Sequence, residues 1–349
     1  MKALTRQKET LSVGLNNRPV IRRFALRTFL TAVVLSLPLP SVAHANSASH
    51  EERNNANNTA SAEVSPRLCK DVSLQVLGSG GPELDDGRSS SAYLIWIDEK
   101  ARVLIDAGSG SSVQFGASGA QFETLNAILL SHLHTDHAAD LPSFIKGGYF
   151  TDRDTDLLVF GPDGNDVMPS TEDYIASLLG KEGAFRYLSS YTVKGKDDYA
   201  ILPKSVNNAF LETPFDHKID NEVSIEAIAV NHGPIPALAW KVNAKGCELV
   251  FSGDTNDEEG HLAKFAKNAD LLVLHNAIDD SAPQAAKNLH MTPTQLIDIA
   301  KRSEAKRIVL SHFMQRSEPG INALTEAMTV IAPGRVYAAQ DLMNITLDE

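Results

Sequence analysis

The feature that most constrains this chain is the segment His132-Leu133-His134-Thr135-Asp136-His137, which holds four metal-binding side chains within six residues. It directly follows residues 127–130, an apolar run that predicts a buried strand. Imidazole and carboxylate groups are common zinc ligands, and a rigid strand can present them together. A loop rich in histidine by chance is the alternative, but the whole chain has only 11 histidines. The segment therefore predicts a metal site at the end of a strand.

Three further candidate ligands occupy the same kind of position, each just after an apolar run. His232 follows residues 223–230, Asp254 follows 248–251, and His312 follows 308–310. Taken singly, either histidine could be a hydrogen-bonded core residue, and Asp254 could cap a following helix. Together with the six-residue segment, they favour one metal site assembled from several strand ends.

The order of the expected elements indicates the fold class. Alternating or continuous apolar runs predict strands at 72–77, 91–97, 101–105, 127–130, 157–160, 223–230, 238–242, 248–251, 271–274 and 308–310. Helical spacing is found at 170–179, 292–303 and 322–331, and residues 180–222 are expected to hold short strands and loops. Two runs of strands, each closed by helices, predict an α+β fold in which a β-sandwich carries helices on its outer faces.

Residues 1–45 have the pattern of an export signal. A basic stretch precedes the apolar run 29–42, and Ala43-His44-Ala45 supplies small residues for cleavage after Ala45. A retained membrane anchor is the alternative, but a run of about 14 residues is short of the ~20 that span a bilayer. We therefore expect a periplasmic or secreted protein with no stable membrane anchor after cleavage. Residues 46–67 lack apolar bulk and predict a disordered linker, which leaves 68–349 as the folded domain.

The charge of the chain is unevenly distributed. Of 32 basic and 44 acidic residues, the first 45 positions hold seven basic and one acidic, which leaves 25 against 43, a net charge of −18. A body this acidic repels phosphate backbones and argues against nucleic acid as a partner. A small anion is still allowed, because bound metal ions dominate the local field.

The chain has two cysteines, Cys69 and Cys247. In an oxidising compartment they could form a disulfide between the first strand and a later hairpin. Two unpaired thiols are the alternative, because the sequence does not give the distance between them.

The six-residue segment, the spaced histidine, the aspartate of Gly253-Asp254-Thr255 and the final Ser311-His312 together resemble the metallo-β-lactamase superfamily. The resemblance covers about residues 70–345 and implies the αββα sandwich of that superfamily. It also implies two Zn²⁺ ions, for which Mn²⁺ or iron could substitute, and a nucleophilic hydroxide held between them. The implied ligands are His132, His134 and His232 for the first ion and Asp136, His137 and His312 for the second, with Asp254 bridging both.

Two branches of the superfamily are similar to this chain. One is the ribonuclease Z group, which it resembles in Gly78-Ser79-Gly80-Gly81-Pro82, in Gly161-Pro162, in His290-Met291-Thr292 and in residues 306–313. The other is the exported, zinc-dependent arylsulfatase-like group (type III sulfatases), which shares most of these motifs. In the nuclease group, the histidine that matches His290 contacts the scissile phosphate and helps to protonate the leaving group.

Two departures from the nuclease pattern favour the sulfatase branch. The nuclease group has a glutamate in a His-Glu-Ala-Thr stretch, where this chain reads His275-Asn276-Ala277-Ile278. A basic arm for gripping tRNA is also not evident in residues 146–215. Together with the predicted export and the acidic charge, these observations predict that the enzyme hydrolyses aryl sulfate esters. Its substrate would be a small anionic ester, and the chain could form a homodimer. A phosphodiesterase or another ester hydrolase, such as a ribonuclease Z-like enzyme or a lactonase, is the alternative, and a metal-binding protein without catalysis is a second one.

The predicted catalytic residues are Asp136, which is also a ligand, and His290, the candidate general acid. A supporting structural histidine is the other interpretation of His290. Asp106 is expected to organise the metal loop through hydrogen bonds. Arg88 and Lys146 could hold an anionic group or could be ordinary solvated charges.

Overall fold

Two seven-stranded β-sheets form the centre of the part of the chain that the computed structural model describes, residues 69–207, 209 and 213–348. The first sheet, in spatial order, consists of β14 (Asn344–Thr346), β1 (Val72–Gly78), β2 (Ala92–Ile97), β3 (Lys100–Ile105), β4 (Ala127–Leu129), β5 (Leu157–Pro162) and β6 (Ile201–Val206). The second sheet consists of β13 (Val336–Ala338), β12 (Ile308–Ser311), β11 (Leu271–His275), β10 (Cys247–Phe251), β9 (Ile235–Ala244), β8 (Val223–His232) and β7 (Phe215–Lys218). Both sheets contain parallel and antiparallel pairs.

Residue patterning decides which faces of the strands are buried. Along β8, Val223, Ile225 and Ala227 are buried and alternate with more exposed residues, as expected for a strand with one covered face. β11 is buried at every position, which suits a strand with helices on one face and the other sheet on the opposite face.

The core between the sheets is rich in large side chains. Trp240 of the second sheet is fully buried, and its ring centroid lies 6.4 Å from that of Phe160 in the first sheet. Tyr93 and Phe251 make a second contact between the sheets, with centroids 5.6 Å apart. The indole of Trp240 also donates a 3.0 Å hydrogen bond to the carbonyl of Leu130, just before the histidine segment. Packing between the sheets therefore holds the start of that segment in place.

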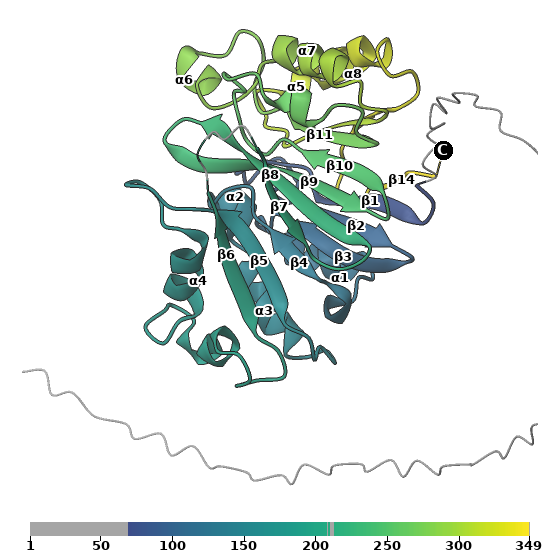
Figure 1. Cartoon of the computed structure of the whole chain (residues 1–349). Helices are drawn as coiled ribbons and strands as arrows, with labels where there is room; N and C mark the ends of the chain where they lie inside the picture. Colours follow the sequence, from purple (N-terminus) through teal and green to yellow (C-terminus); the bar gives the residue numbers. More distant parts are fainter. Residues whose placement is uncertain (1–68, 208, 210–212, 349) are drawn as a thin grey trace, which may run out of the picture. The chain divides into compact units, whose positions relative to one another are not determined.

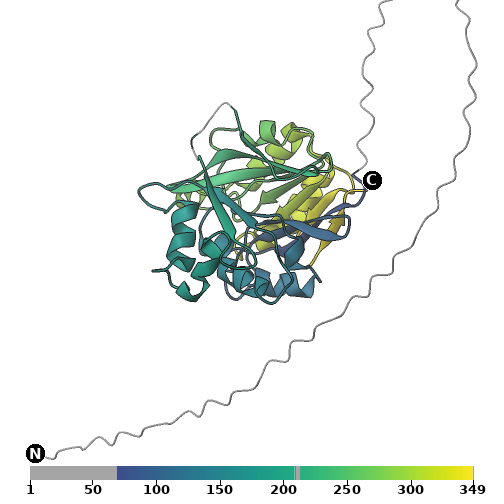
Figure 2. The ribbon, with the colours of Figure 1, turned by 60° about the horizontal axis from the view of Figure 1, so that its bottom comes forward.

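Helices cover the two outer faces of the sandwich (Figures 1 and 2). In Figure 1, α5, α7 and α8 lie beyond the second sheet, whereas α1, α3 and α4 lie against the first. The helices are α1 (Ser111–Ala117), α2 (Thr135–Ala138), α3 (Leu141–Gly148), α4 (Thr171–Leu179), α5 (Leu262–Phe265), α6 (Gln284–Lys287), α7 (Pro293–Ser303) and α8 (Ile321–Thr329), with short 3₁₀ turns at Phe122–Thr124, Arg186–Thr192 and Glu318–Gly320. The predicted αββα sandwich is therefore confirmed.

The helix expected at 292–303 begins as its sequence indicates. Thr292 is the N-cap and accepts a hydrogen bond from the amide of Gln295, whose side chain in turn accepts from the amide of Thr292. The helices α1 and α3 and the strands β13 and β14 were not expected from the sequence. Residues 180–222 contain β6, β7 and a 3₁₀ turn, in line with the expectation of short elements.

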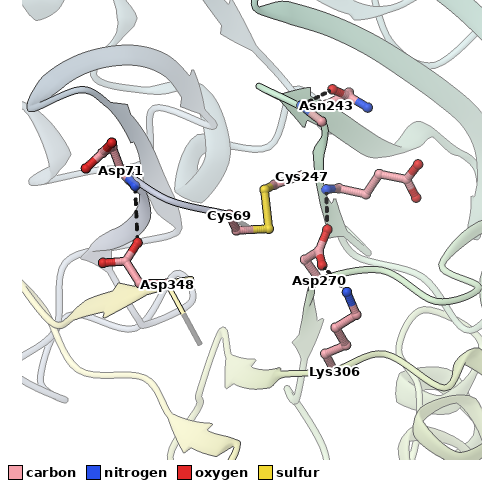
Figure 3. Close-up of a disulfide and its surroundings, with 9 residues drawn as sticks. Cys69, Asp71, Asn243, Cys247, Asp270, Lys306 and Asp348 are labelled. Carbon is pink, nitrogen blue, oxygen red and sulfur yellow. Dashed lines mark hydrogen bonds and ion pairs between the residues drawn. A yellow bond between two sulfur atoms is a disulfide. The ribbon is translucent and has the colours of Figure 1, made fainter. Parts of the chain in front are cut away.

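The two cysteines form a disulfide between Cys69 and Cys247, with a Cα–Cα distance of 5.5 Å (Figure 3). Cys69 precedes β1 of the first sheet, and Cys247 begins β10 of the second. The bond therefore ties the two sheets together across a sequence separation of 178 residues.

The predicted export signal at 1–45 and the predicted linker at 46–67 lie outside the described residues. Within the described residues, no helix has the length and apolar character needed to cross a membrane.

Candidate metal centre

The candidate ligands come together where strands of both sheets end. The segment from His132 to His137 follows β4 of the first sheet, and its second half forms the short helix α2. From the second sheet, His232 is the last residue of β8, Asp254 follows β10, and His312 follows β12. The sandwich thus brings all seven side chains into one buried cluster.

The first ligand group consists of His132, His134 and His232. Nδ1 of His134 lies 3.0 Å from Nε2 of His132 and 3.4 Å from Nε2 of His232. Burial, with His137 nearby, lowers the pKa of His132 well below its usual value, and burial also lowers the pKa of His134. Three imidazoles whose nitrogens converge are a donor set that suits Zn²⁺.

The second group consists of Asp136, His137 and His312. Oδ2 of Asp136 lies 3.2 Å from Nε2 of His312 and 3.5 Å from Nε2 of His137. Nε2 of His137 is buried and has no hydrogen-bond partner, so it is free to bind a metal ion. Burial opposes the charge on His137, but Asp136 and Asp106 outweigh it and raise the pKa of His137 well above its usual value.

Asp254 connects the two groups. Its Oδ2 lies 3.3 Å from Nε2 of His312, 3.7 Å from Nε2 of His137 and 3.8 Å from Nε2 of His232. One carboxylate oxygen therefore faces ligand atoms of both groups, which is the position a bridging ligand requires. Although burial acts in the opposite direction, the neighbouring His312 and His137 hold the pKa of Asp254 well below its usual value.

Asp106 organises the histidine segment through hydrogen bonds. Its carboxylate accepts from the amide of Ser131 at 2.6 Å, from the hydroxyl of Ser131 at 2.9 Å and from Nδ1 of His137 at 2.8 Å. With Nδ1 held by Asp106, the other ring nitrogen of His137 is directed toward Asp136 and Asp254. Supporting carboxylates of this kind fix the tautomer and the orientation of metal-binding histidines.

The backbone around two ligands has unusual geometry. Gly253, just before Asp254, has φ +58°, and a Cβ there would lie 2.8 Å from the carbonyl oxygen of Leu238. His312 itself has φ +56°, although it is not a glycine. A left-handed conformation at a non-glycine residue is maintained only where the surroundings enforce it, and such residues gather at functional sites.

His290, the predicted general acid, lies at the edge of the cluster. Its Nδ1 is 3.8 Å from Oδ2 of Asp254, and its ring centroid is 5.2 Å from that of His232. Burial lowers the pKa of His290 to about 3, so its ring is neutral at pH 7. The preceding residue, Leu289, accepts a 2.9 Å hydrogen bond from Nδ1 of His232 through its carbonyl, which ties His290 to the first ligand group.

His275, which was not among the predicted site residues, also lies within the cluster. It is the last residue of β11, it is buried, and its Nδ1 lies 2.8 Å from Oδ1 of Asp254. Its ligand-capable nitrogen groups with His137, Asp254 and His312. Its place after the apolar run 271–274, which parallels that of the other ligands, is the sequence signal that could have identified it.

The two cations proposed as anion holders have other partners. Arg88 donates to the hydroxyl of Ser79, forms an ion pair with Glu318 at 3.3 Å and lies over the ring of Phe313. Lys146 of α3 lies over the rings of Tyr149 and Phe150.

A different cation, Arg316, lies near His290. Its charge contributes to lowering the pKa of that histidine, and its Nε donates a 2.8 Å hydrogen bond to the carbonyl of Ala277. Arg316 is exposed and follows His312 by four residues, at the same edge of the second sheet.

Solved structures with the same fold cover most of the chain. Human tRNase Z, short form (ELAC1), superposes with a TM-score of 0.61 at 23% identity, over 79% of this chain and 99% of its own. The metallo-beta-lactamase fold protein YhfI from Bacillus subtilis superposes with a TM-score of 0.59 at 19% identity, over 78% and 98%. At these identities the likeness concerns the fold.

Two curated relatives carry the name ribonuclease Z. Ribonuclease Z of Picrophilus torridus is 25% identical over 79% of this chain and 96% of its own length. Ribonuclease Z of Natronomonas pharaonis is 28% identical over 70% of this chain and 88% of its own.

These comparisons overturn the predicted substrate. The prediction of aryl sulfate hydrolysis is wrong, because the matched relatives are ribonucleases Z. The expected small anionic ester and the argument against nucleic acid are wrong for the same reason, since a ribonuclease acts on RNA. The net charge misled because metal ions at a site reverse the local field, whatever the charge of the rest of the surface.

The prediction of a periplasmic or secreted enzyme is contradicted as well. The relatives that match over 70–79% of the chain are named ribonuclease Z. The basic and apolar pattern on which the prediction depended lies within residues 1–45, outside the described part of the chain.

The histidine segment and the strands around it also match a family model. The beta-lactamase superfamily domain matches residues 101–313, which include every predicted ligand and His290. The geometry fits the same assignment, because two groups of candidate metal ligands lie around Asp254 at the ends of strands from both sheets. The chain is therefore a metal-dependent hydrolase that belongs to the beta-lactamase superfamily.

Proposed function

We propose that this protein is a phosphodiesterase of the ribonuclease Z type, which cleaves tRNA. It would use two divalent metal ions, and Zn²⁺ is the ion that we expect. The position of Asp254 carries the proposal. Its Oδ2 faces His232 of the first group, His137 and His312 of the second, and His290 at 3.8 Å. A phosphodiester held here through the metal ions that these residues would bind would lie near both ligand groups and an additional imidazole.

The residues proposed to hold the metals are His132, His134 and His232 for one ion and Asp136, His137 and His312 for the other, with Asp254 shared. Two bound divalent ions supply positive charge that polarises a phosphoryl oxygen and lowers the pKa of water. The buried, unpartnered Nε2 of His137 and the converging nitrogens of the first group fit this assignment.

His290 is proposed to act at the leaving oxygen. Its ring is neutral at pH 7, so it must gain a proton before it can donate one. The negative charge of a bound phosphodiester would raise the pKa of His290 and favour this protonation. Asn276 lies in the position where the nuclease group has a glutamate, and its buried Oδ1 has no hydrogen-bond partner. A carboxylate at this position is therefore not available to charge His290, and the substrate itself must do so.

The test is cleavage of a precursor tRNA with a 3′ extension by the full chain loaded with Zn²⁺. Bis-p-nitrophenyl phosphate and p-nitrophenyl sulfate serve as comparison substrates, and Asp254→Ala serves as the inactive control. Metal-dependent cleavage of the RNA, absent in the variant, would support the proposal. Hydrolysis of bis-p-nitrophenyl phosphate with the RNA left intact would overturn the tRNA assignment. If neither the RNA nor bis-p-nitrophenyl phosphate is cleaved, the phosphodiesterase assignment is overturned.

A further inference from the structure

We propose that His275 is not a metal ligand but a positioning residue, which together with Tyr93 fixes the orientation of the shared carboxylate of Asp254. One ring nitrogen of His275 lies within 4.8 Å of ligand-capable atoms of His137, Asp254 and His312, which would allow it to bind a metal ion with them. The hydrogen bonds of its two ring nitrogens favour the positioning role.

Both nitrogens of His275 already have protein partners. Nδ1 lies 2.8 Å from Oδ1 of Asp254, and Nε2 lies 3.0 Å from the hydroxyl of Tyr93. A carboxylate can only accept a hydrogen bond, so Nδ1 carries the proton and donates it to Asp254. Nδ1 therefore has no free lone pair for a metal ion. Nε2 is covered by the buried hydroxyl of Tyr93, 3.0 Å away.

The partners of His275 are rigid. Tyr93 is fully buried on β2 of the first sheet, and its hydroxyl also lies 2.9 Å from Oγ of Ser311, directly before His312. The amide of His275 donates a 3.1 Å hydrogen bond to the hydroxyl of Ser252, two residues before Asp254. The imidazole is therefore held from both sheets.

The contact with His275 determines which carboxylate oxygen of Asp254 faces the candidate metal ligands. The hydrogen bond from His275 engages Oδ1, which leaves Oδ2 to face His137, His232 and His312. Rotation of the carboxylate would require the buried hydrogen bond to break, and an unsatisfied buried group is costly. His275 thereby selects the oxygen that both ligand groups share, and its loss should weaken both metal sites together.

Zn²⁺ binding distinguishes a positioning residue from a ligand. The full-length protein and its variants would be titrated with Zn²⁺ against a chromophoric chelator, with no RNA present. For His275→Ala we expect two ions still bound at saturation, with both affinities reduced about 10- to 100-fold, as for other residues that support ligands. Loss of one ion with the affinity of the other unchanged would show that His275 is a ligand and would overturn the proposal.

Two conservative variants separate the two hydrogen bonds. The amide of His275→Asn can replace Nδ1 and donate to Asp254, whereas that of His275→Gln reaches the position of Nε2, near Tyr93. We expect His275→Asn to retain more Zn²⁺ affinity than His275→Gln or His275→Ala. Equal affinities in all three variants would contradict a role exerted through Asp254.

Tyr93→Phe provides a variant that removes a single hydroxyl, should changes at His275 prevent folding. Tyr199→Phe is its matched control, because Tyr199 is also buried and donates to the carbonyl of Ile145, remote from the ligands. Both variants should lower thermal stability, but only Tyr93→Phe should weaken Zn²⁺ binding. If the two variants bind Zn²⁺ equally well, Tyr93 has only a structural role.

A long-range ¹H–¹⁵N spectrum should also show His275 protonated at Nδ1, and protonation at Nε2 alone would contradict the assignment.

This role depends on the metal centre of the proposed function and not on its substrate. Failure to cleave RNA would therefore leave the Zn²⁺ titrations interpretable, and the two proposals can fail separately.

Discussion

Oδ2 of Asp106 lies 2.8 Å from Nδ1 of His137, and the same carboxylate accepts the amide and hydroxyl protons of Ser131. Asp106→Asn removes the negative charge and puts an amide in place of one acceptor. We expect it to lower the affinity for the second metal ion about 10- to 100-fold, because His137 loses the partner that orients it. Metal analysis after dialysis against a chelator measures the effect.

The matched control for this variant is Asp140→Asn. Asp140 also accepts from the amide and the hydroxyl of one serine, Ser112, at 2.9 and 2.8 Å. It should retain both metal ions. Equal metal loss in the two variants would mean that general destabilisation, and not the orientation of His137, causes the effect.

Asp254→Ala should remove hydrolysis and lower the occupancy of both metal sites. The reason is that its Oδ2 faces ligands of both groups, at 3.3 Å from His312 and 3.8 Å from His232. His312→Ala, by contrast, should weaken mainly the second site. Metal content and turnover measured together check this expectation. Full activity in Asp254→Ala, on any substrate that the unaltered protein cleaves, would contradict the binuclear arrangement.

The sequence was sufficient to predict which side chains come together, because each of the seven candidate ligands lies beside a local pattern. The six-residue segment and His232, the last residue of β8, are recognisable without knowledge of the fold, and the apolar runs before them can be identified. The place of His275 after an apolar run is also a local signal, but its contact with Asp254 becomes evident only when β11 lies beside β10, where Nδ1 meets the carboxylate. Contacts of this kind depend on the pairing of strands and not on local sequence.

The helices missed on the outer face of the first sheet have weak end signals. α1 has only seven residues, with Gly110 as N-cap and no side-chain capping bond, and α3 ends at Gly148. Local propensity hardly favours such segments, and packing against the sheet stabilises them instead.

The substrate was mispredicted because net charge describes the whole surface, whereas the field at the site depends on the metal ions bound there.

The raised pKa values of His137 and His312 predict how metal binding depends on pH. Burial opposes the charge on each ring, but Asp136 for His137 and Asp254 for His312 outweigh it. A proton held more tightly than usual competes better with a metal ion, so affinity should fall as the pH decreases through these raised values. Zn²⁺ titrations from pH 9 to pH 5 should therefore show weakening that begins above ~6.5, the ordinary pKa of histidine. Constant affinity down to pH 6 would contradict the raised values.

Removal of the disulfide should destabilise the fold without altering the metal centre. Cys69 and Cys247 link the two sheets across 178 residues, and closing a long loop restricts the unfolded chain. For the double variant Cys69→Ser, Cys247→Ser we expect a loss of about 2–5 kcal/mol in the free energy of unfolding. Denaturant titration measures this loss, and Zn²⁺ stoichiometry should remain unchanged.

A reductant provides the control for the disulfide. Dithiothreitol added during unfolding should destabilise the unaltered protein toward the level of the double variant and should have no effect on the variant itself. Equal stability of the two proteins under oxidising conditions would mean that the bond does not contribute.

Arg316 is the cation that the structure places beside His290, where its charge lowers the pKa of that ring. Its Nε is held by the carbonyl of Ala277, while the exposed guanidinium is available to a phosphate of the RNA. Arg316→Ala should raise KM for precursor tRNA about tenfold or more, since a hydrogen bond to a charged group contributes ~1.5–3 kcal/mol. The value of kcat should change little, because the ligands and His290 remain.

Arg302→Ala on α7 is the control, since Arg302 is exposed and paired with Asp298. An equal rise in KM for both variants would indicate a general loss of positive charge, whereas a fall in kcat for Arg316→Ala alone would place Arg316 in the chemical step.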